Sequence, residues 1–236
     1  MVAAGAVESM TSMNPAEIDA VLCAAEEQVA TRGTADLRGL GFWKVVGIVK
    51  RDPALIDEFA DRIGAIDQAV FLAWAPLTFP ILAGTVLAVV GTVVGFGLVG
   101  VSYVEEPWNG LFFLAGTAVL LATTHGLGHL IVGWVVGIRF TVWFAGYRRP
   151  QPGVKTDYAM YLRTPARARA WMHASGAIVT KIIPFLLLPV AIWFAVPTWT
   201  VVVLVVLAVG QVVTDVLWST KASDWAKFRR EMKHGR

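Results

Sequence analysis

Residues 107–138 read PWNGLFFLAGTAVLLATTHGLGHLIVGWVVGI, a stretch without a single Asp, Glu, Lys or Arg. It is longer than the ~20 residues that cross a bilayer as a helix. Two further stretches, 68–104 and 182–214, also lack all four charged residue types. Only 16% of the 236 residues are charged and 56% are hydrophobic, whereas a soluble domain carries about 25% charged residues. These features exclude a soluble enzyme and indicate a polytopic membrane protein.

The rest of the composition narrows the function. Cys23 is the only cysteine in the chain, which excludes a secreted domain held together by disulfide bonds. The net charge of +3 arises because some loops contain more basic residues than others, and not from one basic face. We therefore expect no nucleic-acid partner. We expect an integral membrane protein of the all-α class that contacts membrane lipids.

Residues 1–68 are expected to form a small, water-exposed helical region on the cytoplasmic side. Asn14-Pro15 and Asp52-Pro53 each predict a helix start, because a capping residue is followed by proline at the first helical position. We expect the first helix to end near Gly33. The second has apolar residues at helical spacing and runs to the membrane surface near Trp74.

Four spans fit the apolar stretches within a membrane core at 69–220. They are predicted at about 77–102, 110–137, 171–195 and 198–219. A long loop at 139–169 joins the second span to the third, and a basic tail at 221–236 follows the fourth.

The loops differ in charge and thereby predict the orientation. Residues 139–169 contain seven basic residues and one acidic residue, and the segment after Thr220 contains six basic and two acidic residues. The turn at 103–109 contains two glutamates and no basic residue. Because cytoplasmic loops are enriched in Lys and Arg, we expect both termini and the 139–169 loop in the cytoplasm, and the spans in the plasma membrane of a prokaryote.

Four polar residues lie at membrane depth, where such groups are costly and usually mark a function or a partner: His125, His129, Lys181 and Asp215. The two histidines are four residues apart, so both imidazoles share one helix face and can offer two nitrogens to one metal ion. Asp215 can supply an oxygen as a third ligand. Two histidines and a carboxylate with an open fourth position describe a catalytic zinc site.

Metal-free interpretations of these residues stay open. The two histidines can instead form hydrogen bonds across helices, as polar groups in membrane bundles often do. Asp215 can form an ion pair with Lys181, because the third and fourth spans are antiparallel and both residues lie in the cytoplasmic half. Lys181 could also contact a residue that binds the metal ion without binding the ion itself. For His173, near the start of the third span, we expect an interfacial position.

Residues 124–130, Thr-His-Gly-Leu-Gly-His-Leu, resemble the zinc-binding helix of the site-2 protease family of intramembrane metalloproteases, whose pattern is His-Glu-x-x-His. Gly137-Ile138 is similar to the exit of that helix, and the alternation at 140–144 is similar to the membrane-associated hairpin that follows it. The stretch 174–180 lies where the family has Gly-Pro-x-x-Asn, and Asp215 lies where it has the third ligand. The resemblance covers about residues 108–220 and leaves 1–68 outside.

The resemblance implies a zinc cofactor bound by His125, His129 and Asp215. The family's glutamate, which acts as general base, is replaced here by Gly126, and loss of a positioned base typically removes about 10²–10⁴ in rate. The family's asparagine is replaced by Thr180. We therefore expect a metal-binding membrane protein with impaired or absent peptidase activity, which could bind membrane segments of other proteins. Because glycine leaves its position empty, we expect Gly126→Glu not to unfold the protein.

Two other functions stay open. One is an active intramembrane metallopeptidase with a non-standard base, for which His173 and Thr180 are candidate contributors. The other is a structural membrane subunit or small transporter that holds no metal. The sequence therefore assigns no catalytic residue and leaves open whether the chain is an enzyme.

Overall fold

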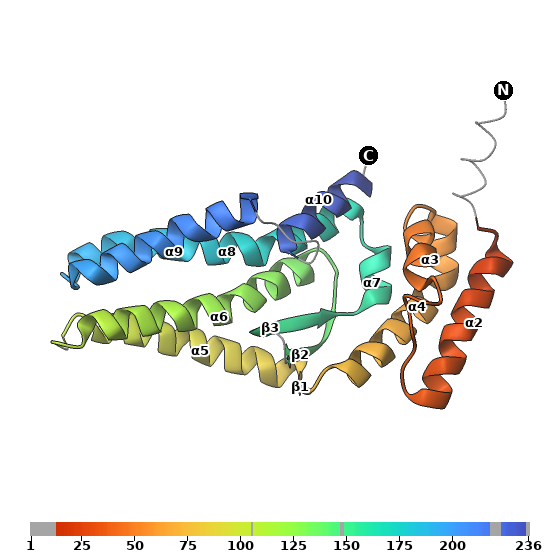
Figure 1. Ribbon diagram of the computed structural model, residues 1–236, viewed down its shortest axis with the longest axis horizontal. Coiled ribbons are helices and arrows are strands. Elements are labelled where there is room, and N and C mark those ends of the chain that lie inside the picture. Colours follow the sequence, from red (N-terminus) through yellow and green to blue (C-terminus); the bar gives the residue numbers. More distant parts are fainter. Residues whose placement is uncertain (1–12, 105, 147–148, 218–222, 235–236) are drawn as a thin grey trace, which may run out of the picture.

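Four long apolar helices dominate the protein, as a computed structural model of residues 13–104, 106–146, 149–217 and 223–234 shows (Figure 1). They are α5 (Ile81–Val101), α6 (Asn109–Val135), α8 (Ala166–Trp193) and α9 (Thr198–Leu217), and each is long and apolar enough to cross a membrane. Most of their outward-facing side chains are exposed valine, leucine, isoleucine and phenylalanine, as lipid contact requires. The predicted helical polytopic membrane fold is confirmed.

The long helices form two antiparallel pairs, α5 with α6 and α8 with α9, and the pairs meet where α6 packs against α8. Both interhelical turns lie at one end of the molecule, and the strands and shorter helices lie at the other (Figure 1). Glycines let the backbones approach closely: a Cβ on Gly116 would lie 2.7 Å from the carbonyl oxygen of Gly95. Small residues at such contacts are typical of membrane helix pairs.

A small antiparallel sheet in the order β1-β2-β3 stands beside the helices. Its strands are β1 (Leu77–Pro80), β2 (Phe140–Gly146) and β3 (Arg149–Thr156). The first predicted span, 77–102, was therefore placed four residues too early, because residues 77–80 pair with β2 and α5 begins only at Ile81. Pro80 explains the boundary, since it lacks an N–H and is tolerated at a strand edge or a helix start.

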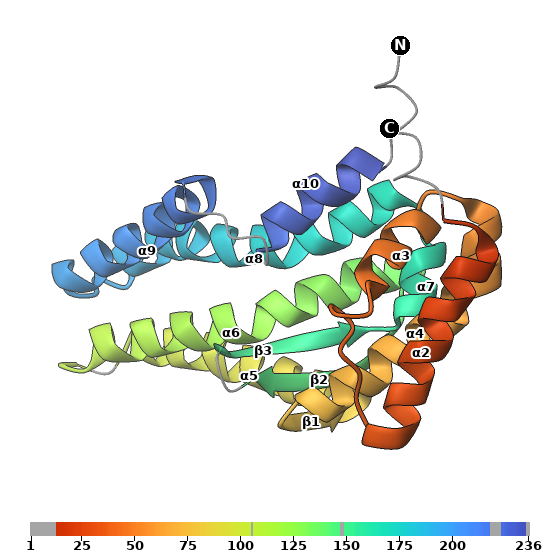
Figure 2. The same cartoon turned by 45° about the vertical axis from the view of Figure 1, so that its right-hand side comes forward.

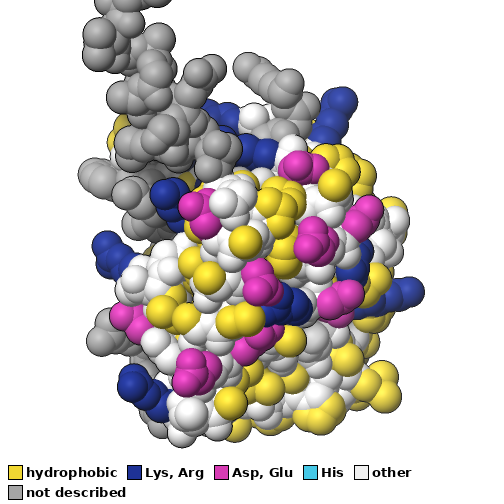
Figure 3. Space-filling view, turned by 90° about the vertical axis from the view of Figure 1, so that its right-hand side faces the viewer, with side chains coloured by type: hydrophobic (Ala, Val, Ile, Leu, Met, Phe, Trp, Pro, Cys, Tyr) yellow, Lys and Arg dark blue, Asp and Glu magenta, His cyan; other side chains and the backbone are white. Residues whose placement is uncertain are grey.

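The N-terminal region forms three helices: α2 (Pro15–Arg32), α3 (Phe42–Val49) and α4 (Pro53–Trp74). Both predicted starts are confirmed, with Asn14 and Asp52 as side-chain caps, and α2 ends at Gly33 with φ +70°. Figure 3 shows acidic and basic side chains interspersed with apolar ones on this end of the molecule, as expected for a water-exposed surface. The short helix α3 was missed because it is only eight residues long.

Two segments predicted as a loop and a tail contain regular structure. The 139–169 segment holds β2, β3 and α7 (Tyr158–Arg163), and α8 begins at Ala166 rather than at 171. Leu162 of α7 joins the hydrophobic core of the N-terminal helices. The predicted basic tail contains α10 (Asp224–His234), which packs along α8 (Figures 1 and 2). This helix brings a polar segment back toward the membrane helices.

The orientation predicted from loop charge gives a direct test with two exposed positions, Glu106 in the α5–α6 turn and Lys44 in α3. In a Cys23→Ser background, Glu106→Cys should react with a membrane-impermeant maleimide on intact cells, and Lys44→Cys should react only after lysis. The reverse pattern would contradict the orientation with cytoplasmic termini.

Candidate metal centre

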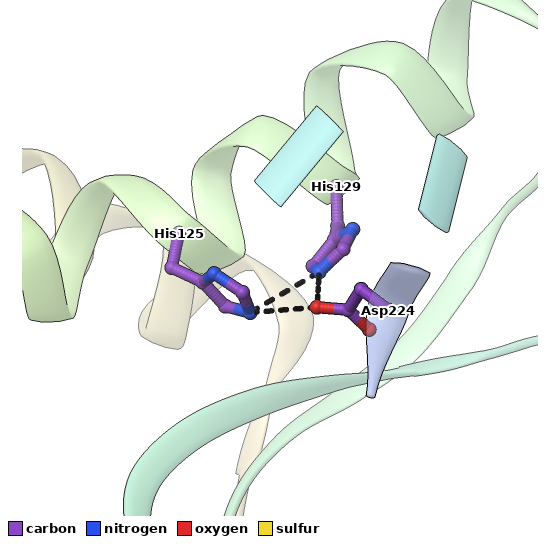
Figure 4. A group of neighbouring side chains, drawn as sticks. All are labelled: His125, His129 and Asp224. Atoms are coloured by element: carbon purple, nitrogen blue, oxygen red, sulfur yellow. Dashed lines mark hydrogen bonds and ion pairs between the residues drawn. The ribbon is translucent and has the colours of Figure 1, made fainter. Parts of the chain in front are cut away.

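Three side chains with metal-binding atoms converge between α6 and α10: His125, His129 and Asp224 (Figure 4). The histidine Nε2 atoms are 3.2 Å apart. Asp224 Oδ2 lies 3.2 Å from Nε2 of His129 and 3.3 Å from Nε2 of His125. The prediction that both imidazoles share one helix face is confirmed by this geometry.

The three distances fit the ligand triangle of a tetrahedral zinc site. Zinc binds nitrogen and oxygen at about 2.0–2.1 Å, which places neighbouring ligand atoms of a tetrahedron about 3.3–3.4 Å apart. The three observed separations lie between 3.2 and 3.3 Å. Nitrogen and carboxylate donors in this number are those of open, three-ligand zinc sites. The residues present therefore fit the ion that the resemblance implies.

The ring of His129 is held with one nitrogen toward this cluster. Its Nδ1 lies 2.8 Å from the carbonyl oxygen of Met172, to which it can only donate. In a neutral imidazole the proton is then on Nδ1 and the lone pair on Nε2, the tautomer in which a histidine binds metal. Gly176 makes room for the ring, because a Cβ there would lie only 2.7 Å from Cδ2 of His129.

Three atoms that can bind a proton or a metal ion meet in this cluster. Burial alone would raise the pKa of the Asp224 carboxyl, but its interactions with His125, His129 and Lys227 hold it below the usual range. Nδ1 of His125 is buried without a hydrogen-bond partner in the described part of the chain. Lys227 contacts the other oxygen of Asp224 at 3.1 Å. A proton or a metal ion between the two Nε2 atoms and Oδ2 of Asp224 would satisfy the lone pairs that meet there.

Asp215, the third ligand expected from the sequence, lies in a different cluster. Its carboxylate forms an ion pair with Lys181, which also donates to the carbonyl oxygen of Ala177 at 3.3 Å and lies 5.8 Å from the Trp225 ring centroid. The structure thus contains the Lys181–Asp215 ion pair that was one of the expected alternatives. Asp224 occupies the position beside the histidines.

Sequence reasoning missed Asp224 because it considered acids within the spans only. Asp224 is the first residue of α10, nine residues after Asp215, in a segment predicted as a solvated tail. A usable signal was present: residues 224–234 have an apolar stripe at helical spacing formed by Trp225 and Phe228. That pattern predicts a helix that returns to pack on the protein.

Both clusters line one cavity of about 1050 Å³ between the two helix pairs and β3. The predicted contributors His173 and Thr180 line it as well. His173 is partly buried and lies 2.9 Å from the Tyr161 hydroxyl. The Thr180 hydroxyl donates to backbone carbonyls of its own helix at 3.1 Å. A substrate or partner that enters this cavity would meet the histidines directly.

The space beside Gly126 is filled. A Cβ on Gly126 would lie 2.5 Å from the Trp143 ring, which is 4% exposed. The indole also packs against Gly84 and donates to the Thr85 hydroxyl at 3.1 Å. The expectation of an empty position that accepts Gly126→Glu is therefore wrong, because β2 inserts Trp143 between α5 and α6.

Comparison of the chain with protein-family profiles, with curated proteins and with solved structures finds no match. The interpretation of the site therefore depends on its own geometry.

The contact between Gly126 and Trp143 predicts that even alanine is costly at this position. Gly126→Ala should lower the free energy of unfolding by about 1–3 kcal/mol, the usual cost of overpacking a buried contact. Gly97→Ala, also in a membrane helix but with open space around the added Cβ, is the matched control. Thermal unfolding of the purified variants in detergent measures the difference. Equal melting temperatures for the two variants would contradict the account of Trp143.

Proposed function

We propose that this protein is an integral membrane metal-binding protein of the site-2 protease type, with zinc held by His125, His129 and Asp224 and with impaired or absent peptidase activity. The observation that supports it best is the triangle of ligand atoms with sides of 3.2–3.3 Å. The order of the sequence features supports the family resemblance: a histidine pair in one membrane helix, a hairpin, then two further membrane helices.

The chain's own residues prepare the site before any ion binds. The Met172 carbonyl orients His129, Gly176 leaves space for its ring, and Asp224 contributes the negative charge that offsets a divalent cation. A zinc ion in such a site with an open fourth position supplies Lewis-acid chemistry for hydrolysis. The cavity beside the three residues leaves room for a further group.

The proposed impairment of activity follows from the interactions of the carboxylates that could act as a general base. Among the described residues that line the cavity, the carboxylates are Asp215 and Asp224. The first is paired with Lys181, and the second is bonded to both histidines. Trp143 fills the space beside Gly126. Neither of these two described carboxylates is therefore free to take a proton from an attacking water, which favours binding of partner membrane segments over their cleavage.

An active metallopeptidase is the second candidate, and one observation favours it. His173 lines the same cavity as the three ligand residues and is oriented by the Tyr161 hydroxyl at 2.9 Å. An oriented imidazole in a cavity is a common general base. A third candidate is a metal-free structural subunit or small transporter, for which the Lys181–Asp215 pair inside the helix bundle would be the functional feature.

The metal ligands give the first test of this proposal. Purified wild-type protein should contain about one zinc per chain by elemental analysis. His129→Ala and Asp224→Asn should each lose most of it, because each removes one ligand. Binding should also weaken as the pH falls toward ~6, since protons compete for the imidazole nitrogens.

The matched control is Lys181→Met/Asp215→Asn, which removes both charges of the neighbouring ion pair and leaves neither partner unpaired. It should retain zinc. Zinc loss in this control with retention in Asp224→Asn would restore Asp215 as the third ligand. Equal, near-zero metal in wild type and His129→Ala would favour the metal-free candidate.

The expected lack of a base gives a separate test of activity. Purified protein should not cleave a membrane-helix reporter above the background measured with a chelator. Robust cleavage that the chelator abolishes would favour the second candidate. His173→Gln should then remove about 10²–10⁴ of the rate if His173 is the base, while zinc content stays at the wild-type level.

A further inference from the structure

Helix α10 carries Asp224 to the histidines, and its packing determines where that carboxylate lies. Phe228 and Glu231 follow Asp224 by four and seven residues, so the three side chains lie on one face of α10. Phe228 contacts Trp171 of α8, with ring centroids 5.5 Å apart. Figures 1 and 2 show α10 lying along the first turns of α8.

Glu231 is the deepest anchor of α10. Its side chain is 0% exposed, and its two oxygens are each bound by a different cation. Oε2 accepts from Nε of Arg169 at 2.8 Å, and Oε1 accepts from Nζ of Lys50 at 2.8 Å. A buried carboxylate remains charged only with such partners, and removal of it leaves two buried cations short of a counter-ion.

The two cations tie α10 to separate parts of the protein. Arg169 belongs to α8 and also donates to the carbonyl oxygens of Leu162 and Thr164 at the end of α7, at 3.1 and 2.7 Å. Lys50 follows α3 in the N-terminal region, and its ammonium lies 4.8 Å from the Tyr161 ring centroid. Glu231 is therefore the point at which the N-terminal region meets the helix that carries Asp224.

The ionisation of Glu231 also supports its role as the anchor of α10. Burial alone would raise the pKa of the Glu231 carboxyl, but Lys50 and Arg169 lower it to about 2. The carboxylate is thus ionised across the physiological pH range, and both ion pairs are present together. Glu231 stands about two helical turns from Asp224, roughly 10 Å along the axis, so it acts on the candidate metal centre only through the helix.

We propose that Glu231 is a positioning residue for Asp224: by joining Arg169 and Lys50 it holds α10 in the place where Asp224 completes the ligand triangle, and the N-terminal region thereby contributes to metal binding. This inference rests on the proposed metal centre. It assigns a role to the N-terminal helices, which the family resemblance does not cover. The Lys50–Glu231 ion pair is the contact through which that region reaches α10.

The test compares Co²⁺ and Zn²⁺ binding by full-length variants in detergent. Glu231→Gln should bind Zn²⁺ about 10–100-fold more weakly, because α10 no longer holds Asp224 beside the histidines; loss of a group that orients a metal ligand has effects of this size. The visible spectrum of bound Co²⁺ reports the ligands directly, and in Glu231→Gln it should shift toward that of Asp224→Asn. Trypsin should also cleave within α10, at Lys227, Arg229 or Arg230, faster than in wild type. Asp61→Asn, which removes an exposed ion pair with Arg163 and the same charge, should match wild type in all three measurements.

Lys50→Met provides a milder variant that keeps the Arg169–Glu231 pair. Its affinity for Zn²⁺ should lie between those of wild type and Glu231→Gln. The double variant Lys50→Met/Glu231→Gln should lose less than the sum of the two single losses, since it removes one unpaired cation. A wild-type affinity in Lys50→Met would remove the N-terminal region from the proposal, whether or not Glu231→Gln folds.

The outcomes separate this inference from the proposed function. Wild-type affinity and a wild-type Co²⁺ spectrum in Glu231→Gln would overturn the positioning role and leave the metal centre intact. Equal binding by wild type and Asp224→Asn, or binding by neither, would overturn the metal centre itself. Faster proteolysis of α10 in Glu231→Gln with an unchanged Co²⁺ spectrum would show that the helix is held by Glu231 without controlling Asp224, and would also overturn the proposal.

Discussion

The close approach of α6 to α8 is the contact on which the candidate metal centre depends. A Cβ on Gly128 would lie 3.3 Å from the Cα of Gly176, so the two backbones nearly touch. At this distance the Met172 carbonyl reaches Nδ1 of His129, and the ring fits against Gly176. Side chains larger than glycine would separate the helices and turn the ring away. Backbone proximity thus creates the orientation that a metal ligand needs.

Trp143 occupies the space beside Gly126 and thereby limits which side chains fit there. The indole stands between Gly84 and Gly126 with its N–H bonded to Thr85, so it joins the sheet to two membrane helices. The indole leaves no room for a larger side chain at position 126, so packing alone requires glycine there. A catalytic carboxylate and this tryptophan would compete for the same space. The packing of β2 against the helices and the proposed loss of peptidase activity have one physical cause.

Three buried or partly buried carboxylates in the described part of the chain are paired with cations. Asp215 pairs with Lys181, Glu231 pairs with two cations, and Asp67 pairs with Lys155. The cluster of Asp224 differs from these, because its carboxylate meets two imidazole nitrogens in addition to Lys227. Buried charges without partners are costly in a low-dielectric surrounding. This contrast distinguishes Asp224 from the structural ion pairs as the residue suited to a metal ion.

The amino-acid sequence by itself determined the helical membrane fold, the caps at Asn14 and Asp52, and the shared face of His125 and His129. These features depend on local composition and on the 3.6-residue period of a helix, which act within a few residues. Only the tertiary structure decided which aspartate meets the histidines and what fills the space at Gly126. Asp215 and Asp224 are nine residues apart in sequence. Because α10 packs on α8, Asp224 and not Asp215 lies beside the histidines. That docking depends on Glu231, Lys50 and Arg169, which are far apart in sequence, so no local pattern contains it.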